Sequence, residues 1–409
     1  MGFRFMELPC RLPLLLGGAA GLPPTEAGMP AGACPELWAL EHPQAVLELQ
    51  RRYILAGCSV LYAPTAGASR ARLAAYGLAG QVQELNRRLV SLTREAAGAV
   101  PKSRCWIAGA LSPTGLRGES PSEAPFDQWV DIFSEQAAAL KEAGVDLLAC
   151  EAMTSLSEAR AALLAARRTG LPVLVSLEVN DEGEAPSGAH FLPAVITLQA
   201  LGAAAVGLDG PSGPAGMQEP LSEALPHALV PLAARPNTVA EDGSPLSPLQ
   251  FGRAMAPLLD VGAAVIGGGP AATPEHLAVL RGIADEHPTV APREIDTDAC
   301  AVESEALFLS DDLEYGAPIP CDSDLADRLI EAEEEGNAAL VELSQPGDID
   351  NLLDYGGMSR LPILLHADEA LLLDEALRRF PGRLLVDSLC EIERPLLEDI
   401  AARYGALVF

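Results

Sequence analysis

The sequence predicts an α/β protein, in which a (β/α)8 barrel is followed by a smaller open parallel α/β domain. From residue 12 to about residue 285, short apolar runs alternate with Ala-, Leu-, Glu- and Arg-rich stretches of helical periodicity. Glycines follow several of these helical stretches, as expected where a helix ends and a parallel strand begins. Eight such units in roughly 270 residues fit a closed barrel. A doubly wound open sheet is the alternative, and the regular repeats favour closure.

The predicted barrel strands are short and apolar, and chemistry in such barrels sits where the strands end. They cover Leu14–Leu16, Ser59–Tyr62, Trp106–Ala110, Asp146–Cys150, Pro172–Leu177, Ala204–Leu208, Ala228–Leu232 and Ala263–Ile266. Between them, apolar residues recur at the spacing of one helical face, for example in Ile132-Phe133-Ala137-Leu140. These spacings predict the helices that connect the strands.

The last barrel unit is the stretch Val261–His276, which predicts a buried strand, a turn of three glycines and a helix. Thr273 suits the N-cap of that helix, Pro274 its first position, and Glu275 complements its positive end. The turn contains no Cys, His, Asp or Lys before Glu275. A barrel site at this point would therefore depend on backbone or on side chains from other strands.

The second part of the chain is predicted as a separate, incomplete unit. Periodicity is lost after Glu286, where Pro288 and Pro292 follow, so we divide the chain into a barrel of residues 1–288, a linker of residues 289–304 and a domain of residues 305–409. This part has five predicted parallel strands. They are too few to close a barrel, so we expect an open sheet. They are expected at Ala306–Leu309, Ala339–Leu343, Pro362–His366, Leu384–Ser388 and Ala406–Phe409.

Composition limits the classes of function. The chain has 409 residues, 49% of them apolar, and a formal net charge of −30, which disfavours nucleic acid and anionic membranes as partners. No apolar run approaches the length of a membrane span. The eight cysteines include no C-x-x-C pair and lie in apolar surroundings, which predicts reduced, buried thiols in a cytoplasmic protein.

A series of motifs, in order, resembles the homocysteine S-methyltransferases, the family of the substrate barrel of methionine synthase. Pro35-Glu-Leu-Trp-Ala-Leu-Glu-His-Pro43 resembles their Pro-Glu-x-Trp-Asn-Leu-x-x-Pro signature. The resemblance covers about residues 12–284, and the tail is similar to the opening units of a pterin-binding barrel. Further matching motifs are Tyr53-x-x-Ala-Gly57, Thr65-x-Gly-Ala68, Gly109-x-x-x-Pro113-Thr-Gly115, Glu151-x-x-x-Ser-Leu-x-Glu158, Pro236-Asn237 and Thr273-Pro-Glu-His276.

The resemblance implies methyl transfer to the thiol of homocysteine, which such enzymes activate with a zinc ion held by three cysteinates. The three ligand positions of the family correspond to Gly210, Gly269 and Pro270. None of these residues binds a metal through its side chain, and three lost ligands of a soft-metal site cannot be replaced by water. We therefore expect no zinc and an altered or impaired reaction, and leave the use of folate or cobalamin open.

Four residues are candidates for substrate binding. Glu151 matches a family glutamate that contacts the amine of homocysteine, and a cap or an ion pair is its alternative role. Asp209 is either a polar group of the pocket or, by preference, the N-cap of the next helix. For Asn237, the preferred role is to shape its own loop by backbone hydrogen bonds, and contact with a ligand is the other. Thr65 completes the set, and strand alternation places Cys150 on the opposite face from Glu151 as a buried thiol.

Two functions follow from these residues. One is an enzyme that still acts on homocysteine or a related thiol or amine without the zinc. The other is a catalytically inactive barrel that binds a small amino acid, or that interacts with a corrinoid protein or an intact homologue. The edge strand that ends at Phe409 is a candidate seam for a homo-oligomer.

Overall fold

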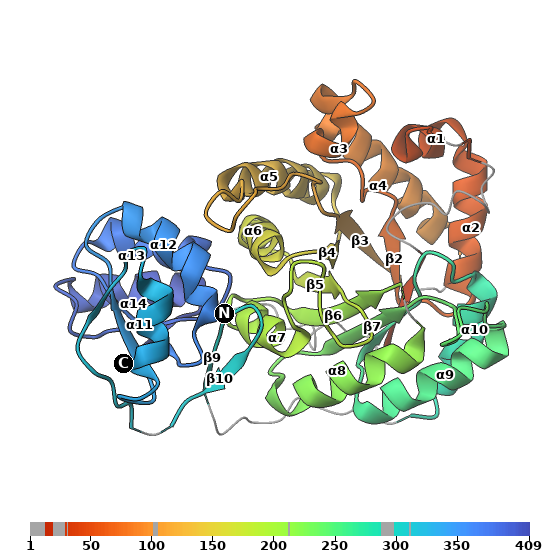
Figure 1. The fold of residues 1–409 in the computed structure, drawn as a ribbon. Helices are drawn as coiled ribbons and strands as arrows, with labels where there is room; N and C mark the ends of the chain where they lie inside the picture. Colours follow the sequence, from red (N-terminus) through yellow and green to blue (C-terminus); the bar gives the residue numbers. More distant parts are fainter. Residues whose placement is uncertain are drawn as a thin grey trace.

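The computed structural model describes residues 13–18, 29–30, 32–100, 105–211, 213–287, 298–310 and 312–409. Within these residues eight parallel strands close into a barrel in chain order, and β1 pairs with β8 to complete the ring. The barrel predicted from the sequence is therefore confirmed (Figure 1). Its strands are β1 (Leu14–Gly17), β2 (Val60–Ala63), β3 (Trp106–Leu111), β4 (Leu147–Met153), β5 (Val173–Glu178), β6 (Ala205–Gly210), β7 (Leu232–Pro236) and β8 (Val265–Ile266).

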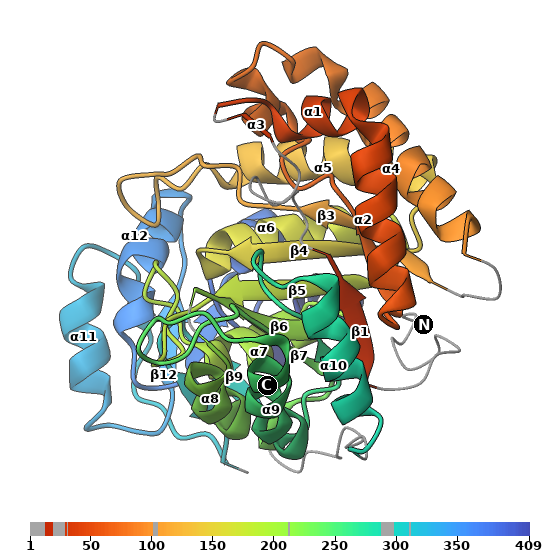
Figure 2. The ribbon, with the colours of Figure 1, turned by 90° about the vertical axis from the view of Figure 1, so that its right-hand side faces the viewer.

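Helices surround the barrel, with α2, α4 and α5 on one side of the strands and α8, α9 and α10 on the other in the view of Figure 2. No helix in the described part of the chain is both long and apolar enough to cross a membrane. The barrel helices are α1 (Pro35–Glu41), α2 (Pro43–Leu55), α3 (Arg70–Ala74), α4 (Val82–Gly98), α5 (Phe126–Ala143), α6 (Leu156–Arg167), α7 (Phe191–Ala200), α8 (Gln218–Ala224), α9 (Pro248–Val261) and α10 (Pro274–Ala284).

Alternate residues of each strand face the barrel interior, where small side chains predominate. Leu16, Val60 and Tyr62 on β1 and β2 pack there against alanines of β3, β4, β6 and β7. A Cβ at Gly207 would lie 2.6 Å from the Cβ of Ala233, so glycine is required for β6 and β7 to approach this closely. The opposite faces of the strands contribute to a larger apolar cluster with the helices.

Strand β7 lies four residues later than the sequence prediction of Ala228–Leu232. Pairing with β6 begins only at Leu232, opposite Val206, and continues to Pro236, opposite Gly210. The residues before it form a turn in which Leu229 is 57% exposed, so the apolar run was not a buried strand. Because β7 extends from Leu232 to Pro236, Arg235 lies within the strand and faces the barrel interior.

The last barrel unit forms as predicted. Strand β8 leads through the glycine turn to α10, whose N-cap is Thr273 with Pro274 next. The side chain of His276 accepts from the backbone N–H of Thr273, which completes a capping box. Its other ring nitrogen contacts the carbonyl oxygen of Leu246 at 2.9 Å, so His276 is structural.

The C-terminal unit contains a parallel sheet of five strands, ordered β11 to β15 within the residues described. The order confirms an open α/β sheet. Its strands and helices are β11 (Ile319–Pro320), α11 (Leu325–Ala332), β12 (Ala339–Glu342), α12 (Gly347–Tyr355), β13 (Ile363–His366), α13 (Ala370–Arg379), β14 (Leu385–Val386), α14 (Arg394–Tyr404) and β15 (Leu407–Val408).

The predicted strand Ala306–Leu309 does not belong to this sheet. Its residues form β10 (Ala306–Phe308), which pairs antiparallel with β9 (Ala299–Ala301). A short turn joins these two strands, and a turn of that length permits only antiparallel pairing, because a parallel connection needs about a dozen residues. Strand β9 falls in the expected linker, whose residues 289–297 lie outside the described residues.

The C-terminal unit lies beside α6 and α7 of the barrel, with the β9–β10 hairpin next to α7 (Figure 1). Ala301 and Arg383 exchange two backbone hydrogen bonds that join the hairpin to the sheet unit. The amide of His190, which precedes α7, donates to the carbonyl oxygen of Glu303 in the hairpin turn at 2.9 Å. The hairpin therefore bonds to both units.

Candidate functional site

Three charged side chains meet at the carboxyl end of the barrel strands. Glu151 on β4, Asp209 on β6 and Arg235 on β7 all face the interior, and we call them the mouth cluster. Nη1 of Arg235 forms a close ion pair with Oε1 of Glu151 and lies 3.5 Å from Oδ1 of Asp209. None of the three side chains is more than 11% exposed.

Neighbouring strands complete the surroundings of the mouth cluster. Oδ2 of Asp209 accepts from the hydroxyl of Ser176 at 2.5 Å and from the amide of Ala152 at 2.9 Å. The guanidinium of Arg235 lies over the ring of Tyr62, 5.0 Å from its centroid, in a cation–π arrangement. Asp209 is therefore a buried member of the mouth cluster. The turn that follows β6 has Gly213 at its N-cap, so the capping interpretation of Asp209 is wrong.

Strand β4 is distorted where it contributes Glu151. Its pairing with β5 shifts register between Cys150 and Met153, and Ala152 has φ of 50°, the left-handed region that disfavours a side chain. This conformation accompanies the hydrogen bond from the Ala152 amide to Asp209. Backbone strain thus occurs beside the mouth cluster, as it does at many functional sites.

Burial and charge act against each other in the cluster. Burial raises the pKa of Glu151, and the positive charge of Arg235 counteracts that rise. Burial alone would lower the pKa of Arg235, but the carboxylates of Asp209 and Glu151 hold it well above the usual value. The guanidinium is therefore a permanent cation, and each carboxylate depends on it for a partner.

The positions that correspond to the family's zinc ligands lie together at the ends of β6, β7 and β8. Gly210 is the register partner of Pro236, and the amide of Gly269 donates to the carbonyl oxygen of Pro236 at 2.8 Å. Pro270 follows directly. The residues present do not fit zinc, since none offers a ligating side chain. Among all residues described, no group of three or more His, Cys, Asp or Glu side chains could hold a metal ion.

The comparisons with known proteins agree with the barrel fold. A family model described as homocysteine S-methyltransferase matches residues 16–284. The chain belongs to the homocysteine S-methyltransferase family. The methionine synthase of Mycobacterium leprae is 26% identical over 259 residues, which cover 60% of this chain and 21% of that protein. That of Mycobacterium tuberculosis is 25% identical over 259 residues, covering 60% of this chain and 22% of that protein.

The chain therefore spans about a fifth of the length of these curated relatives. Solved structures support the fold of the family barrel. The oxidized and metallated forms of the homocysteine methyltransferase MmuM from Escherichia coli each align with a TM-score of 0.56 and 24% identity. Each alignment covers 66% of this chain and 95% of that chain.

Several residues of the family motifs hold the scaffold. Glu158 on α6 accepts from the amide of Thr114 at 2.6 Å and from its hydroxyl at 2.7 Å, which fixes the loop after β3. The hydroxyl of Tyr53 donates to the carbonyl oxygen of Ala272 at 2.8 Å and so supports the turn before α10. The motifs that identify the family here maintain loop geometry.

The other predicted site residues are occupied by local bonds. Thr65 is fully buried, and its hydroxyl bonds to the backbone of Ala110 on β3. The side chain of Asn237 accepts from the amide of Thr238, which is the loop-shaping bond preferred for it from the sequence. Cys150 faces the outer apolar cluster, as alternation predicts, and burial raises its pKa.

Loops that follow β5, β6 and β7 form a cleft of about 630 Å³, which we call the outer cleft. Asp181, Glu241 and Asp242 contribute its acidic side chains, while Val239 and Leu246 are among its apolar ones. A Cβ at Gly213 would lie 1.9 Å from the carbonyl oxygen of Val239, so glycine is required where these loops meet. The cleft suits a ligand with a cationic and an apolar part.

Arg235 is the residue that sequence reasoning missed. It directly precedes Pro236-Asn237, a family motif that the predicted strand Ala228–Leu232 left outside. A strand extended to Pro236 would have included Arg235, on the same face as Ala233 by alternation. The apolar run Ala228–Leu232 led to a strand prediction a few residues too early, and that prediction did not include Arg235.

Proposed function

We propose that the barrel does not catalyse zinc-dependent methyl transfer and acts instead as a binding module that takes a small amine-bearing ligand. The observation that carries the proposal is the ion pair between Arg235 and Glu151. Glu151 corresponds to the family residue expected to contact the amine of homocysteine. Here a cation of the chain itself already takes that carboxylate.

An incoming ammonium would have to displace a buried guanidinium that is shared with Asp209. Removing one member of a buried ion pair from its partner costs about 3–5 kcal/mol, which would subtract directly from the affinity of such a ligand. The lost thiolate positions Gly210, Gly269 and Pro270 support the same proposal. Without a metal, a thiol with a pKa near 8.5 stays mostly protonated at neutral pH.

The outer cleft offers the ligand a different place. Its acidic side chains Asp181, Glu241 and Asp242 suit an ammonium or guanidinium group, and its apolar lining suits a short side chain. This cleft lies at the carboxyl end of the barrel strands, where barrel proteins bind their ligands. Interaction with a corrinoid protein or an intact homologue remains the second candidate, favoured by the relationship to methionine synthases.

An activity assay tests the first half of the proposal. The full chain is incubated with zinc, L-homocysteine and methylcobalamin or methyltetrahydrofolate, and methionine is measured. We expect no turnover above a protein-free control. Zinc-dependent methionine formation by the purified chain would overturn the proposal.

A binding experiment tests the second half. Amino acids and small amines are screened by thermal shift, and hits are titrated calorimetrically. We expect Asp181→Asn with Glu241→Gln to weaken binding at least tenfold, because two charge-assisted contacts are lost. Glu182→Gln is the matched control, since Glu182 neighbours Asp181 but does not line this cleft. Equal affinities of the double variant and the control would exclude the cleft.

A further inference from the structure

A second cleft lies at the seam between the barrel and the C-terminal unit, and its lining is exclusively basic and apolar. Four arginines line it with Val130, Leu164 and Tyr404, and no acidic side chain does. We call it the seam cleft. In a chain with 57 acidic and 27 basic residues, such a concentration of one charge is unexpected. The arginines are Arg167 and Arg168 at the end of α6, Arg378 on α13 and Arg403 on α14.

The arginines of α6 bring positive charge that no carboxylate neutralises within the part of the chain described. Arg167 donates to the carbonyl oxygens of Leu201 and Arg403, at 2.8 and 2.6 Å, and forms no ion pair there. Arg168 is exposed, and its side chain makes no hydrogen bond or ion pair with any residue described. Burial lowers the pKa of Arg167, Tyr404 opposes this, and the charges of Arg168 and Arg403 lower it further. Like charges are thus held close together.

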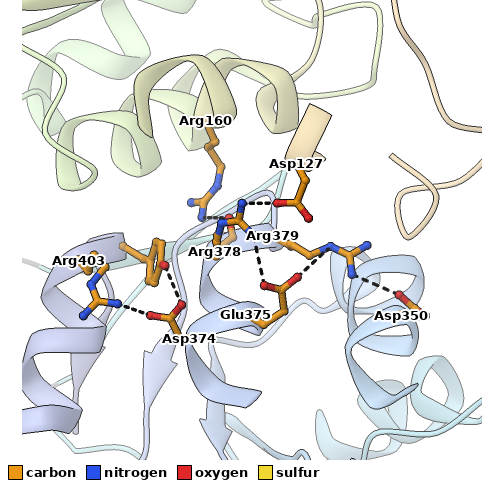
Figure 3. A network of polar contacts seen from close by, with 9 residues as sticks. Asp127, Arg160, Asp350, Asp374, Glu375, Arg378, Arg379 and Arg403 are labelled. Atoms are coloured by element: carbon orange, nitrogen blue, oxygen red, sulfur yellow. Dashed lines mark hydrogen bonds and ion pairs between the residues drawn. The ribbon is translucent and has the colours of Figure 1, made fainter. Parts of the chain in front are cut away.

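The arginines of the C-terminal unit are fixed in place by carboxylates outside the cleft. Arg378 pairs with Asp127 of the barrel and with Glu375, and Arg403 pairs with Asp374 at 2.5 Å (Figure 3). These ion pairs orient the guanidinium groups. They leave Arg378 and Arg403 able to offer further N–H donors, while Arg167 and Arg168 supply the net charge.

The seam is otherwise rigid. Arg160 on α6 is fully buried and donates to the carbonyl oxygens of Gly382 and Leu377, each at 2.7 Å. Arg379 donates to the carbonyl oxygen of Ser122 at 2.6 Å. These bonds join the two units, and Arg167, Arg378 and Arg403 are held by their own bonds in the free protein. Only the side chain of Arg168 needs ordering on binding.

We propose that the seam cleft binds a small phosphate-type oxyanion, either inorganic phosphate or the phosphate group of a small ester. Planar guanidinium groups suit the oxygens of phosphate, and several converging on one cleft distinguish a dianion from chloride. The cleft measures about 220 Å³, the volume of about seven water molecules in the liquid, which suits a small ligand. Bound there, the anion would bridge α6 to α13 and α14.

Calorimetric titration of the full chain with inorganic phosphate and with glycerol 3-phosphate, at constant ionic strength set by chloride, tests the proposal. Saturable binding of one anion per chain is expected. Arg168→Ala should weaken it about tenfold and Arg168→Glu should abolish it, since a charge-assisted contact is lost or reversed. Arg168 is exposed, so both variants should fold. Arg88→Ala is the control, because Arg88 is also exposed but lies on α4, away from the seam.

The two probes distinguish the source of the anion. Tighter binding of the ester than of inorganic phosphate would indicate a phosphorylated small molecule, and binding of phosphate alone would indicate the free ion. Both outcomes support the proposal. No saturable binding of either anion, or unchanged affinity in Arg168→Glu, would overturn it. None of these results depends on ligand binding at the barrel mouth.

Discussion

The mouth cluster buries three charged side chains, those of Arg235, Glu151 and Asp209. Each can be buried in its charged form only because the others are present. The guanidinium compensates two carboxylates that water does not reach, and Tyr62 covers its face. Such clusters are poor sources of stability but costly to break, because removing one partner leaves an uncompensated buried charge. The same arrangement supports our proposal that Glu151 does not contact a substrate amine.

A series of substitutions tests this dependence. Arg235→Met should lower the free energy of unfolding by about 3–5 kcal/mol, since two carboxylates then lack their cation. Adding Glu151→Gln and Asp209→Asn to Arg235→Met should recover a large part of that loss, because the remaining groups are neutral. Urea denaturation of the three proteins gives the values. A cost below about 1 kcal/mol for Arg235→Met would contradict the account.

At the scale of elements, local signals worked where a run of residues had one interpretation. The Thr273-Pro274 start of α10 and the parallel barrel strands formed as expected. The errors arose where pairing decides the structure. The apolar run Ala228–Leu232 resembled a strand, but β7 pairs with β6 only from Leu232 onward. The residues Ala306–Phe308 resembled a parallel strand, but they pair antiparallel with the adjacent β9 and form a hairpin.

The turn of that hairpin carries a titrating group. Burial raises the pKa of Glu303 to about 7, opposed by the charge of Arg160, whereas glutamate in an unfolded chain titrates near pH 4.3. Between these pH values the folded protein binds the proton more tightly than the unfolded chain. The stabilising contribution is therefore complete below about pH 4.3 and is lost as the pH rises through 7, a total change of about 4 kcal/mol.

The substitution Glu303→Gln should remove this dependence. We expect the wild type to lose about 3 kcal/mol of unfolding free energy between pH 4.5 and 7.5 relative to Glu303→Gln. Denaturation by urea at both pH values measures it, with Glu305→Gln as control because that exposed side chain lies in the same turn. Parallel pH profiles for the wild type and Glu303→Gln would show that Glu303 does not titrate in this way.

For the whole molecule, the order of repeats was sufficient to predict a barrel followed by an open sheet, because periodicity and turn chemistry are local properties. How the two units meet was not predictable. Arg160, Asp127 and Arg378 are ordinary charged helix residues in the sequence, and only the folded arrangement brings them to one seam. Glu151 and Asp209 were predicted as site residues, but their pairing with Arg235 was not, since the three residues come from three different strands.

At this scale, membership of the family is compatible with the absence of ligating side chains at the three zinc-ligand positions. The motif residues that support loops and helix starts are present, as Tyr53, Thr114, Glu158 and His276 show. The positions Gly210, Gly269 and Pro270 lie where the ends of β6, β7 and β8 meet, yet none has a ligating side chain. We infer that the barrel keeps the scaffold of a metal site that it no longer forms.

The zinc content of the purified protein tests this inference directly. The purified chain is saturated with zinc, desalted and analysed for bound metal, beside a variant that combines Gly210→Cys, Gly269→Cys and Pro270→Cys. The account predicts well below stoichiometric zinc in the wild type and about one zinc per chain in the variant, because three thiolates would then meet on an existing scaffold. One tightly held zinc in the wild-type chain would contradict it.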